Sequence, residues 1–186
     1  MATVNILPNA DISNSPAWTL STGSDVFALL DDDDTGVPSS DGSQITTTAA
    51  GKKCVVGFQD FTEDHSSIES VQAVIKADIN ARGQNYTLGM RILNNGSGSA
   101  AWSEETISAN SSISWNTHTF TSRATSTSGG DDWDEDDFGT NALAMEIHAH
   151  TMSGNTLRVT YAYFIITYTA AAVAVTDNAT FFGANF

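Results

Sequence analysis

Three polar residues that alternate with apolar ones in a single segment are the chain's best candidates for metal ligands. Glu146, His148 and His150 are spaced two residues apart, and on a β-strand such side chains share one face, about 7 Å apart. Two imidazoles and a carboxylate are ligands that zinc and related ions use. The alternative is a polar strand surface that happens to hold two histidines, because His65 and His118 lie in unrelated segments. We favour the polar surface and keep the three residues as minor metal candidates.

Two acidic runs could bind a hard cation through carboxylate oxygens. The first is Asp31-Asp32-Asp33-Asp34, and the second extends from Asp131 to Asp137. Neither run has the Asp-x-Asp-x-Asp-Gly spacing of an EF-hand loop. Solvated acidic loops are therefore the favoured interpretation, and we expect no cofactor. A structural Ca²⁺ held by Asp131, Asp132 and Asp134 is the minor alternative.

Tryptophan side chains provide the candidates for a glycan-stacking surface. Trp102 and Trp133 lie beside turn-forming residues, where an indole can be exposed and can stack on a sugar ring. Packing in the core or in an interface is the alternative for each of them.

Catalytic motifs are missing from the sequence. It contains no Gly-x-Ser-x-Gly elbow, no phosphate-binding glycine loop and no zinc-protease helix motif. Paired carboxylates can hydrolyse a glycoside, but with 22 acidic residues some pair always lies close together. We therefore expect a protein that is not an enzyme.

Charge and composition restrict the partners. Seven Lys and Arg against 22 Asp and Glu give a net charge of −15, which repels nucleic-acid phosphates. No apolar run approaches the roughly 20 residues of a membrane helix, so we expect neither nucleic acid nor membrane as a partner. The single cysteine, Cys54, lies in an apolar run and is interpreted as a buried core residue. The first residues lack a basic and a hydrophobic region, so we expect synthesis in the cytoplasm.

Two-residue alternation dominates the middle of the chain and predicts strands. Three apolar stripes stand out: Val71, Ala73, Ile75, Ala77 and Ile79; Tyr86, Leu88, Met90 and Ile92; and Leu143, Met145, Ile147 and Ala149. The short Gly-containing join between the first two stripes predicts a hairpin. Shorter strands are expected at 4–7, 18–21, 25–29, 44–48, 53–59, 104–108 and 114–121. The fold class is therefore all-β, a two-sheet antiparallel β-sandwich of jelly-roll type with extended N- and C-terminal arms.

The last strand is apolar on both faces, which predicts a central strand covered on both sides. One face holds Leu157, Val159, Tyr161, Tyr163 and Ile165, and the other holds Ala162, Phe164 and Ile166. We expect Phe164 and Ile166 to be covered by a neighbouring subunit.

The two ends differ from the middle. Residues 1–16 are interpreted as an N-terminal arm, 17–169 as the sandwich and 170–186 as a C-terminal docking tail. Phe181, Phe182 and Phe186 crowd the end of that tail, and such side chains are costly to leave in water. The tail either folds back on its own sandwich or contacts a neighbouring subunit, and we favour subunit contact through these three residues.

Several loose motifs follow one another along the chain: Ile6-Leu7-Pro8-Asn9, Trp18, Leu29-Leu30-Asp31, Ile68-Glu69-Ser70-Val71, Trp133-Asp134 and Leu157-Arg158-Val159-Thr160. Their order resembles that in the β-sandwich modules of tailed-phage virions, a group of modules similar to carbohydrate-binding modules. Such modules serve as capsid decoration or cement proteins, head fibres, and tail or receptor-binding proteins.

The resemblance implies a virion structural protein that decorates or cements an icosahedral capsid. Its expected partners are the major capsid protein and further copies of itself as a dimer or trimer, and its expected location is the capsid surface. The alternative is a receptor- or glycan-binding module of a phage tail or head appendage.

Overall fold

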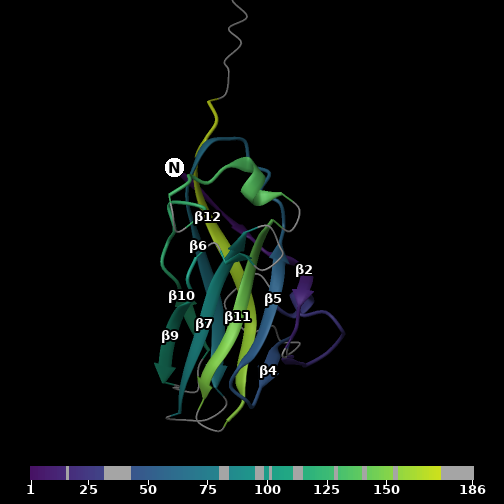
Figure 1. Cartoon of the computed structure of the whole chain (residues 1–186). Coiled ribbons are helices and arrows are strands. Elements are labelled where there is room, and N and C mark those ends of the chain that lie inside the picture. Colours follow the sequence, from purple (N-terminus) through teal and green to yellow (C-terminus); the bar gives the residue numbers. More distant parts are fainter. Residues whose placement is uncertain are drawn as a thin grey trace, which may run out of the picture.

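The computed structural model describes residues 1–15, 17–31, 43–79, 84–94, 99–100, 102–110, 115–127, 130–139, 142–152 and 155–172. These residues form two facing antiparallel sheets, as the alternation predicts (Figure 1). The only helical elements in these ranges are two short 3-10 turns, η1 (Phe27–Leu29) and η2 (Glu135–Phe138). None of the helices among the described residues is long and apolar enough to cross a membrane.

The first sheet, sheet A, is built around the long final strand. Its order is β10 (Asn116–Thr119), β6 (His65–Ile79), β12 (Leu157–Ala170), β4 (Ile45–Thr47) and β3 (Thr19–Leu20), with β1 (Ala2–Ile6) also paired to β12. Strand β6 pairs with β12 along nearly its whole length, and β4 and β1 pair with opposite ends of β12. The expectation of a central final strand is confirmed.

The second sheet, sheet B, carries the polar residues considered below. Its order is β2 (Pro8–Ser13), β5 (Lys52–Phe58), β11 (Leu143–Met152), β7 (Asn85–Asn94) and β8 (Ser99–Ala100), with β9 (Glu105–Asn110) also paired to β7. Strand β11 is central and has β5 on one side and β7 on the other.

The expected hairpin between the first two stripes is wrong. Strand β6 pairs with β10 and β12 in sheet A, whereas β7 pairs with β8, β9 and β11 in sheet B. Both stripes are nevertheless buried as predicted. The chain crosses from sheet A to sheet B between the two strands. The apolar stripe of each strand is then buried against the inner face of the opposite sheet.

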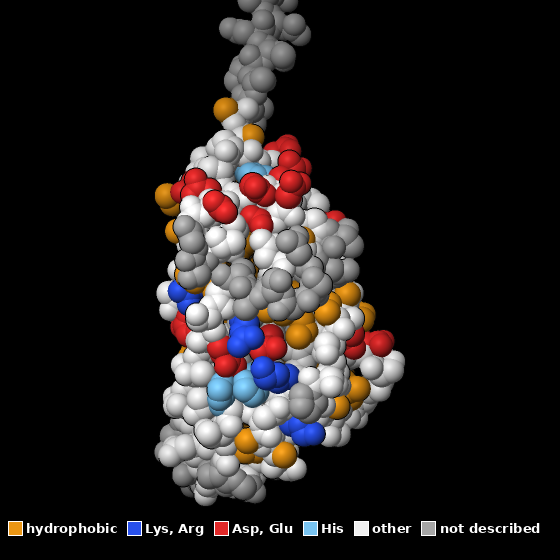
Figure 2. Space-filling view, in the orientation of Figure 1, with side chains coloured by type: hydrophobic (Ala, Val, Ile, Leu, Met, Phe, Trp, Pro, Cys, Tyr) orange, Lys and Arg blue, Asp and Glu red, His pale blue; other side chains and the backbone are white. Residues whose placement is uncertain are grey.

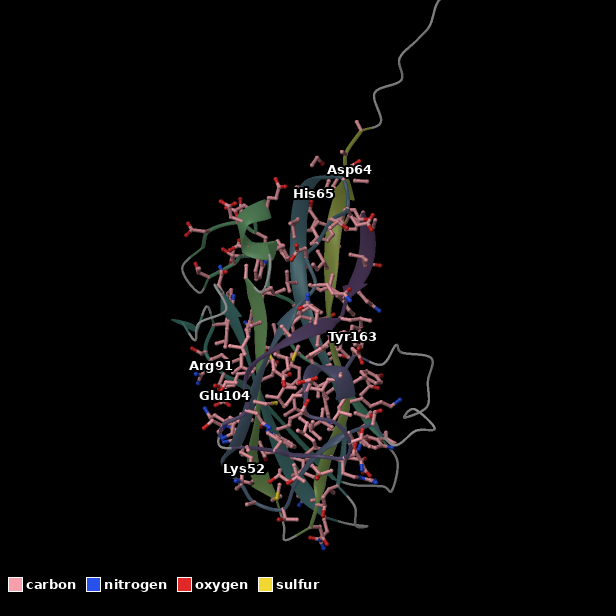
Figure 3. The ribbon with its side chains drawn as sticks, turned by 90° about the vertical axis from the view of Figure 1, so that its right-hand side faces the viewer. Lys52, Asp64, His65, Arg91, Glu104 and Tyr163 are labelled. Atoms are coloured by element: carbon pink, nitrogen blue, oxygen red, sulfur yellow. The ribbon has the colours of Figure 1, made fainter. Side chains whose placement is uncertain are left out.

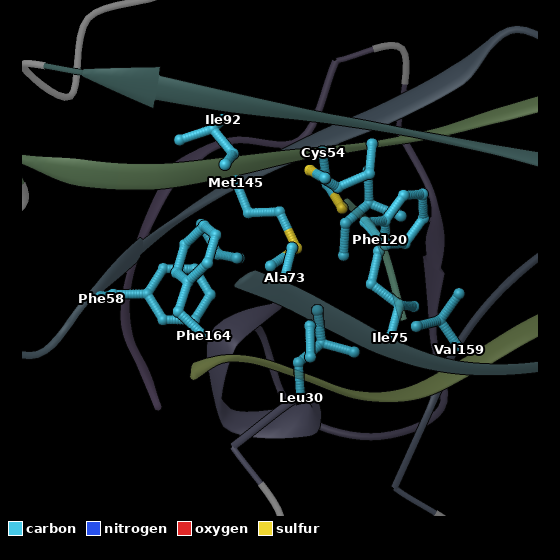
Figure 4. Packing of buried hydrophobic residues seen from close by; sticks show 14 of the residues in the cluster. Leu30, Cys54, Phe58, Ala73, Ile75, Ile92, Phe120, Met145, Val159 and Phe164 are labelled. Carbon is cyan, nitrogen blue, oxygen red and sulfur yellow. The ribbon is translucent and has the colours of Figure 1, made fainter. Parts of the chain in front are cut away.

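Side chains from both sheets interdigitate in one core (Figure 4). The rings of Phe58 on β5 and Phe164 on β12 lie with centroids 4.5 Å apart across the sandwich. Cys54 is fully buried in the same core, as expected, and burial raises the pKa of its thiol.

Phe164 and Ile166 are internal, which corrects their assignment to a subunit contact. Both side chains have 0% exposure and belong to the core. The register of β12 against β6 shifts between Val159 and Tyr161, and the extra residue moves the following side chains to the opposite face. Consequently Phe164 points inward together with Val159, while Tyr161, Tyr163 and Ile165 form a separate small cluster with Val74 and Leu7.

Residues 2–13 belong to the sandwich, which corrects the expected N-terminal arm. Strand β1 pairs with β12 in sheet A and β2 pairs with β5 in sheet B. Strand β2 was not expected because Pro8 and Asp11 are poor strand formers, but it lies at a sheet edge, where Pro is tolerated. Asp11 also explains why 25–29 forms η1 and not a strand: its carboxylate accepts hydrogen bonds from the backbone N–H groups of Val26 and Phe27, both at 2.7 Å.

The C-terminal docking tail is described only at its start. Ala170 ends β12, and Ala171 donates its backbone N–H to the carbonyl of Asp64 at 3.1 Å. Phe181, Phe182 and Phe186 lie outside the described residues. Their role in subunit contact stays a prediction.

A buried imidazole–phenol pair gives the fold a dependence on pH. His118 on β10 is 6% exposed, and its Nε2 lies 2.6 Å from the hydroxyl of Tyr86 on β7. Burial lowers the pKa of His118 below its ordinary value of 6.5, and burial raises the pKa of Tyr86 to about 12.

We expect the free energy of unfolding to fall as the pH drops from 7.5 to 5.5. In this range the unfolded chain protonates His118 near pH 6.5, whereas burial lowers the pKa of His118 in the folded protein. The unfolded state therefore binds more protons, and stability falls by at most about 1.4 kcal/mol per pH unit. Urea denaturation of the wild type and of His118→Gln at both pH values checks this. The variant should lose less stability than the wild type over this interval, and equal losses would contradict the assignment.

Candidate functional site

The predicted polar residues of β11 lie on the outer face of sheet B, the face that points away from the core. Leu143, Met145 and Ile147 point into the core, so the residues between them point away from it. Glu146, His148 and His150 are partly exposed there. The sequence therefore predicts correctly which side of the strand carries them.

The two histidines meet a carboxylate that sequence reasoning missed. Glu104 directly precedes β9, and its Oε1 lies 2.7 Å from Nδ1 of His148 while its Oε2 lies 2.9 Å from Nε2 of His150. The two imidazole rings lie with centroids 4.1 Å apart. Potential ligand atoms of these three residues all lie within 4.8 Å of one another. Burial acts to raise the pKa of Glu104, but the hydrogen bonds with His150 and His148 outweigh it and hold that pKa below its ordinary value.

Gly89 on β7 provides the space for this cluster. It lies opposite His148 in the register of β7 against β11. A Cβ atom at position 89 would overlap the Glu104 carboxylate and would lie 2.8 Å from Cδ2 of His150. Any larger residue at this position would therefore push Glu104 and His150 apart.

Glu146 does not join the histidines, which corrects the predicted set. Its Oε1 lies 3.1 Å from Nζ of Lys53 on β5 and 3.7 Å from a guanidinium nitrogen of Arg91 on β7. The physical reason is charge: Arg91 lies directly opposite Glu146 in the register of the two strands, and an opposite charge at that position attracts the carboxylate.

These side chains together make up the polar face of sheet B, defined as Lys53, Arg91, Glu104, Glu146, His148 and His150. Figure 2 shows two neighbouring histidine side chains, with basic and acidic side chains beside them, in the lower half of the face in view. Arg91 and Glu104 lie on the same side in Figure 3, whereas His65 lies towards one end of the molecule. The side chains of the polar face are 13–34% exposed, so each can contact a ligand from solvent.

The two tryptophans expected to stack on sugars are engaged inside the protein. Trp133 is 4% exposed, packs against Phe138 and donates its indole N–H to the carbonyl of Arg123 at 2.8 Å. Trp102 is partly buried, and the guanidinium of Arg123 lies 4.4 Å from its ring centroid. The prediction that Trp133 stacks on a sugar is therefore wrong. One side of the Trp102 ring is covered by Arg123.

The acidic run from Asp131 to Asp137 stabilises local structure. Asp134 accepts a hydrogen bond from the N–H of Asp136, and Asp137 accepts one from the N–H of Asp134, which together cap η2. Asp131 and Asp132 are exposed. In the part of the chain that the structure describes, only Glu104, His148 and His150 form a group of three potential metal ligands, so Asp131, Asp132 and Asp134 do not converge on a Ca²⁺ site. Of the other run only Asp31 is described.

A polar hollow of about 440 Å³ lies where the start of β6 meets the segment around Trp133. Its lining includes Ser67, Glu69 and Asp132. The Glu69 carboxylate accepts hydrogen bonds from the hydroxyls of Ser67 and Thr169, which lower its pKa. Glu69, Ser67 and Thr169 thus satisfy one another, and the described residues that line the hollow hold no cluster of three potential metal ligands.

No protein-family model matches the chain, and no curated protein matches it. Solved structures do resemble it. The CBM36-1 domain of a multidomain xylanase from the hindgut metagenome of Trinervitermes trinervoides is 12% identical with a TM-score of 0.40, and the alignment covers 92% of this chain and 100% of that one.

Two further structures show a similar degree of likeness. The xylan-binding module CBM15 is 17% identical with a TM-score of 0.41, covering 91% of this chain and 100% of that one. The enzymatically active domain of tailspike protein 4 from bacteriophage CBA120 is 8% identical with a TM-score of 0.41, covering 89% of this chain and 19% of that one. Values this low carry no argument about this chain, whose fold class rests on its own two sheets.

Proposed function

We propose that this β-sandwich is a non-catalytic glycan-binding module whose contact surface is the polar face of sheet B. The observation that supports the proposal is the arrangement of six partly exposed, hydrogen-bonding side chains together on the outer side of sheet B. Sugar hydroxyls both donate and accept hydrogen bonds, so a surface that recognises them needs both kinds of partner. Arg91 and Lys53 donate, the two glutamates accept, and the histidines can do either.

Ion pairs and hydrogen bonds between these side chains order the surface before a ligand binds. Lys53 is held by Glu146, and both histidines are held by Glu104. Side chains that are already ordered lose less conformational entropy when a ligand binds. The polar face is therefore organised before the glycan arrives.

Charge favours a neutral glycan. With neutral histidines the polar face carries two positive and two negative groups, which cancel. The whole chain has a net charge of −15, so an acidic polysaccharide is repelled at long range. Neutral plant or bacterial polysaccharides are the expected class.

Affinity electrophoresis tests the proposal. We expect the protein to be retarded in gels containing at least one neutral polysaccharide from a panel of xylan, glucan and mannan, and not in gels containing alginate. The double variant Lys53→Gln/Arg91→Gln should bind at least about tenfold more weakly, because each hydrogen bond to a charged group contributes roughly 1.5–3 kcal/mol.

Lys52→Gln is the matched control, because Lys52 is adjacent in sequence to Lys53 but alternates to the other side of β5. It should bind like the wild type. Failure to bind any polysaccharide, or equal binding by the double variant, would overturn the proposal. Thermal unfolding of each variant separates loss of contact from loss of fold.

Decoration of a phage capsid is the second candidate function. It is supported by the end of β12, where Ala171 and Ala172 are exposed and lead towards the three C-terminal phenylalanines in the sequence. The major capsid protein and further copies of this chain would be its partners, and the capsid surface its location. Quantitative mass spectrometry of purified virions distinguishes the two: decoration requires a copy number comparable to that of the major capsid protein.

A further inference from the structure

We infer that Glu104, His148 and His150 form a binding site for a divalent transition-metal ion of the Zn²⁺ class. Three features of the polar face carry this inference: the kinds of ligand, their convergence, and the space that Gly89 leaves for them. The inference does not depend on glycan binding.

The ligand set matches the preferences of zinc. Two imidazole nitrogens and one carboxylate oxygen bind Zn²⁺ at about 2.0–2.2 Å. Ca²⁺ instead requires six to eight oxygen ligands, which this cluster does not offer. The combination of two histidines with one carboxylate therefore selects a transition metal over the alkaline-earth ions.

The three ligand groups already converge. Ligand atoms about 2.1 Å from a tetrahedral zinc ion lie roughly 3.4 Å from one another, whereas Glu104 now lies 2.7 and 2.9 Å from the two histidine nitrogens. One ligand atom from each residue lies within 4.8 Å of the other two, so each separation has to change by less than about 1.5 Å to admit an ion. Each imidazole must then carry its proton on the ring nitrogen that faces away from the ion.

The surroundings restrict the three side chains without closing the site. Gly89 is the floor of the cluster, because any Cβ there would occupy the space of Glu104 and His150. The side chains of His148, Glu104 and His150 are 13%, 17% and 34% exposed, so an ion can enter from solvent. Glu146 binds the nearby cations Lys53 and Arg91, which reduces their repulsion of a metal ion.

Three protein ligands leave a fourth tetrahedral position open. In zinc proteins such an open position is filled by water or by a ligand. Here it would face solvent in the middle of the polar face. A hydroxyl or carboxylate of a bound molecule could therefore coordinate the ion directly.

Titration of the chelator-treated full-length protein with ZnCl₂ tests the inference. Isothermal titration calorimetry should show one Zn²⁺ bound per chain, and Co²⁺ in place of Zn²⁺ should give the intense visible absorption of a tetrahedral site. Glu104→Gln and His150→Ala should each weaken binding by at least about 10- to 100-fold, the range seen when even an outer-shell partner is lost. Gly89→Ala should weaken it as well.

His65→Ala is the matched control, because His65 is a half-buried histidine at the start of β6 in the other sheet. It should bind Zn²⁺ like the wild type. Absence of saturable binding, or binding that survives in both Glu104→Gln and His150→Ala, would overturn the inference. Circular dichroism confirms that each variant is folded, and Glu104→Gln decides the question if His150→Ala is not.

Discussion

Replacement of Phe164 by alanine should lower the free energy of unfolding by about 3–5 kcal/mol, the cost of removing a buried aromatic ring and leaving a cavity. Phe164 has no exposed surface, and its ring contacts Phe58 from the opposite sheet. The substitution therefore removes a contact that joins the two layers of the sandwich. Urea denaturation followed by circular dichroism measures the loss.

Ile165→Ala serves as the control, because Ile165 is only partly buried and packs on the small outer cluster of sheet A. It should cost clearly less than Phe164→Ala. A Phe164→Ala protein of undiminished stability that fails to oligomerise would contradict the internal position of Phe164 and would return it to a subunit contact.

Replacement of Arg158 by methionine should have a comparable effect on stability, about 3–5 kcal/mol. Arg158 on β12 forms an ion pair with Asp78 on β6, and the Asp78 side chain is 2% exposed. Arg158 is 26% exposed but Asp78 is buried, and taking an opposite charge away from a buried carboxylate is costly. The guanidinium also lies 4.9 Å from the ring centroid of Trp115, a contact that methionine replaces only in part.

Urea denaturation of three variants separates these contributions. Arg158→Lys keeps the charge and should cost less than Arg158→Met. The double variant Asp78→Asn/Arg158→Met removes the buried charge as well, so it should recover part of the stability. A double variant that is less stable than Arg158→Met would show that the ion pair is not the source of the effect.

The strand pattern could be predicted from the sequence because burial on one side of a strand leaves a two-residue period. The stripes from Val71 to Ile79 and from Leu143 to Ala149 are buried as predicted. What the period does not specify is which strands pair. Strands β6 and β7 follow each other along the chain, yet they lie in different sheets. Two apolar stripes can be buried side by side in a hairpin or face to face between two sheets, and the two-residue period is the same in both cases.

The faces of β12 could not be assigned because of one extra residue. If the two-residue alternation continued without interruption through Thr160, Val159 and Tyr161 would lie on the same face of the strand. The register shift between them places their side chains on opposite faces. No residue type marks that shift in the sequence, since neither Gly nor Pro occurs there.

Only the part of the candidate site that lies on β11 could be predicted from the sequence. His148 and His150 share a face because they are two residues apart, whereas Glu104 reaches them because β9 pairs with β7 and β7 pairs with β11. That contact spans 44 residues for His148. The cue in the sequence was Gly89, a glycine in the interior of a strand, which often marks the close approach of another group.

Chemical-shift mapping of the isotope-labelled protein with a polysaccharide that retards it tests the central claim most directly. The account predicts that the largest shifts cluster on β5, β7 and β11 at the polar face, around Lys53, Arg91 and His150, and that residues around Trp133 and on sheet A change little. Shifts centred on the hollow beside Trp133 or on sheet A, with the polar face unaffected, would contradict the assignment of the glycan-binding surface.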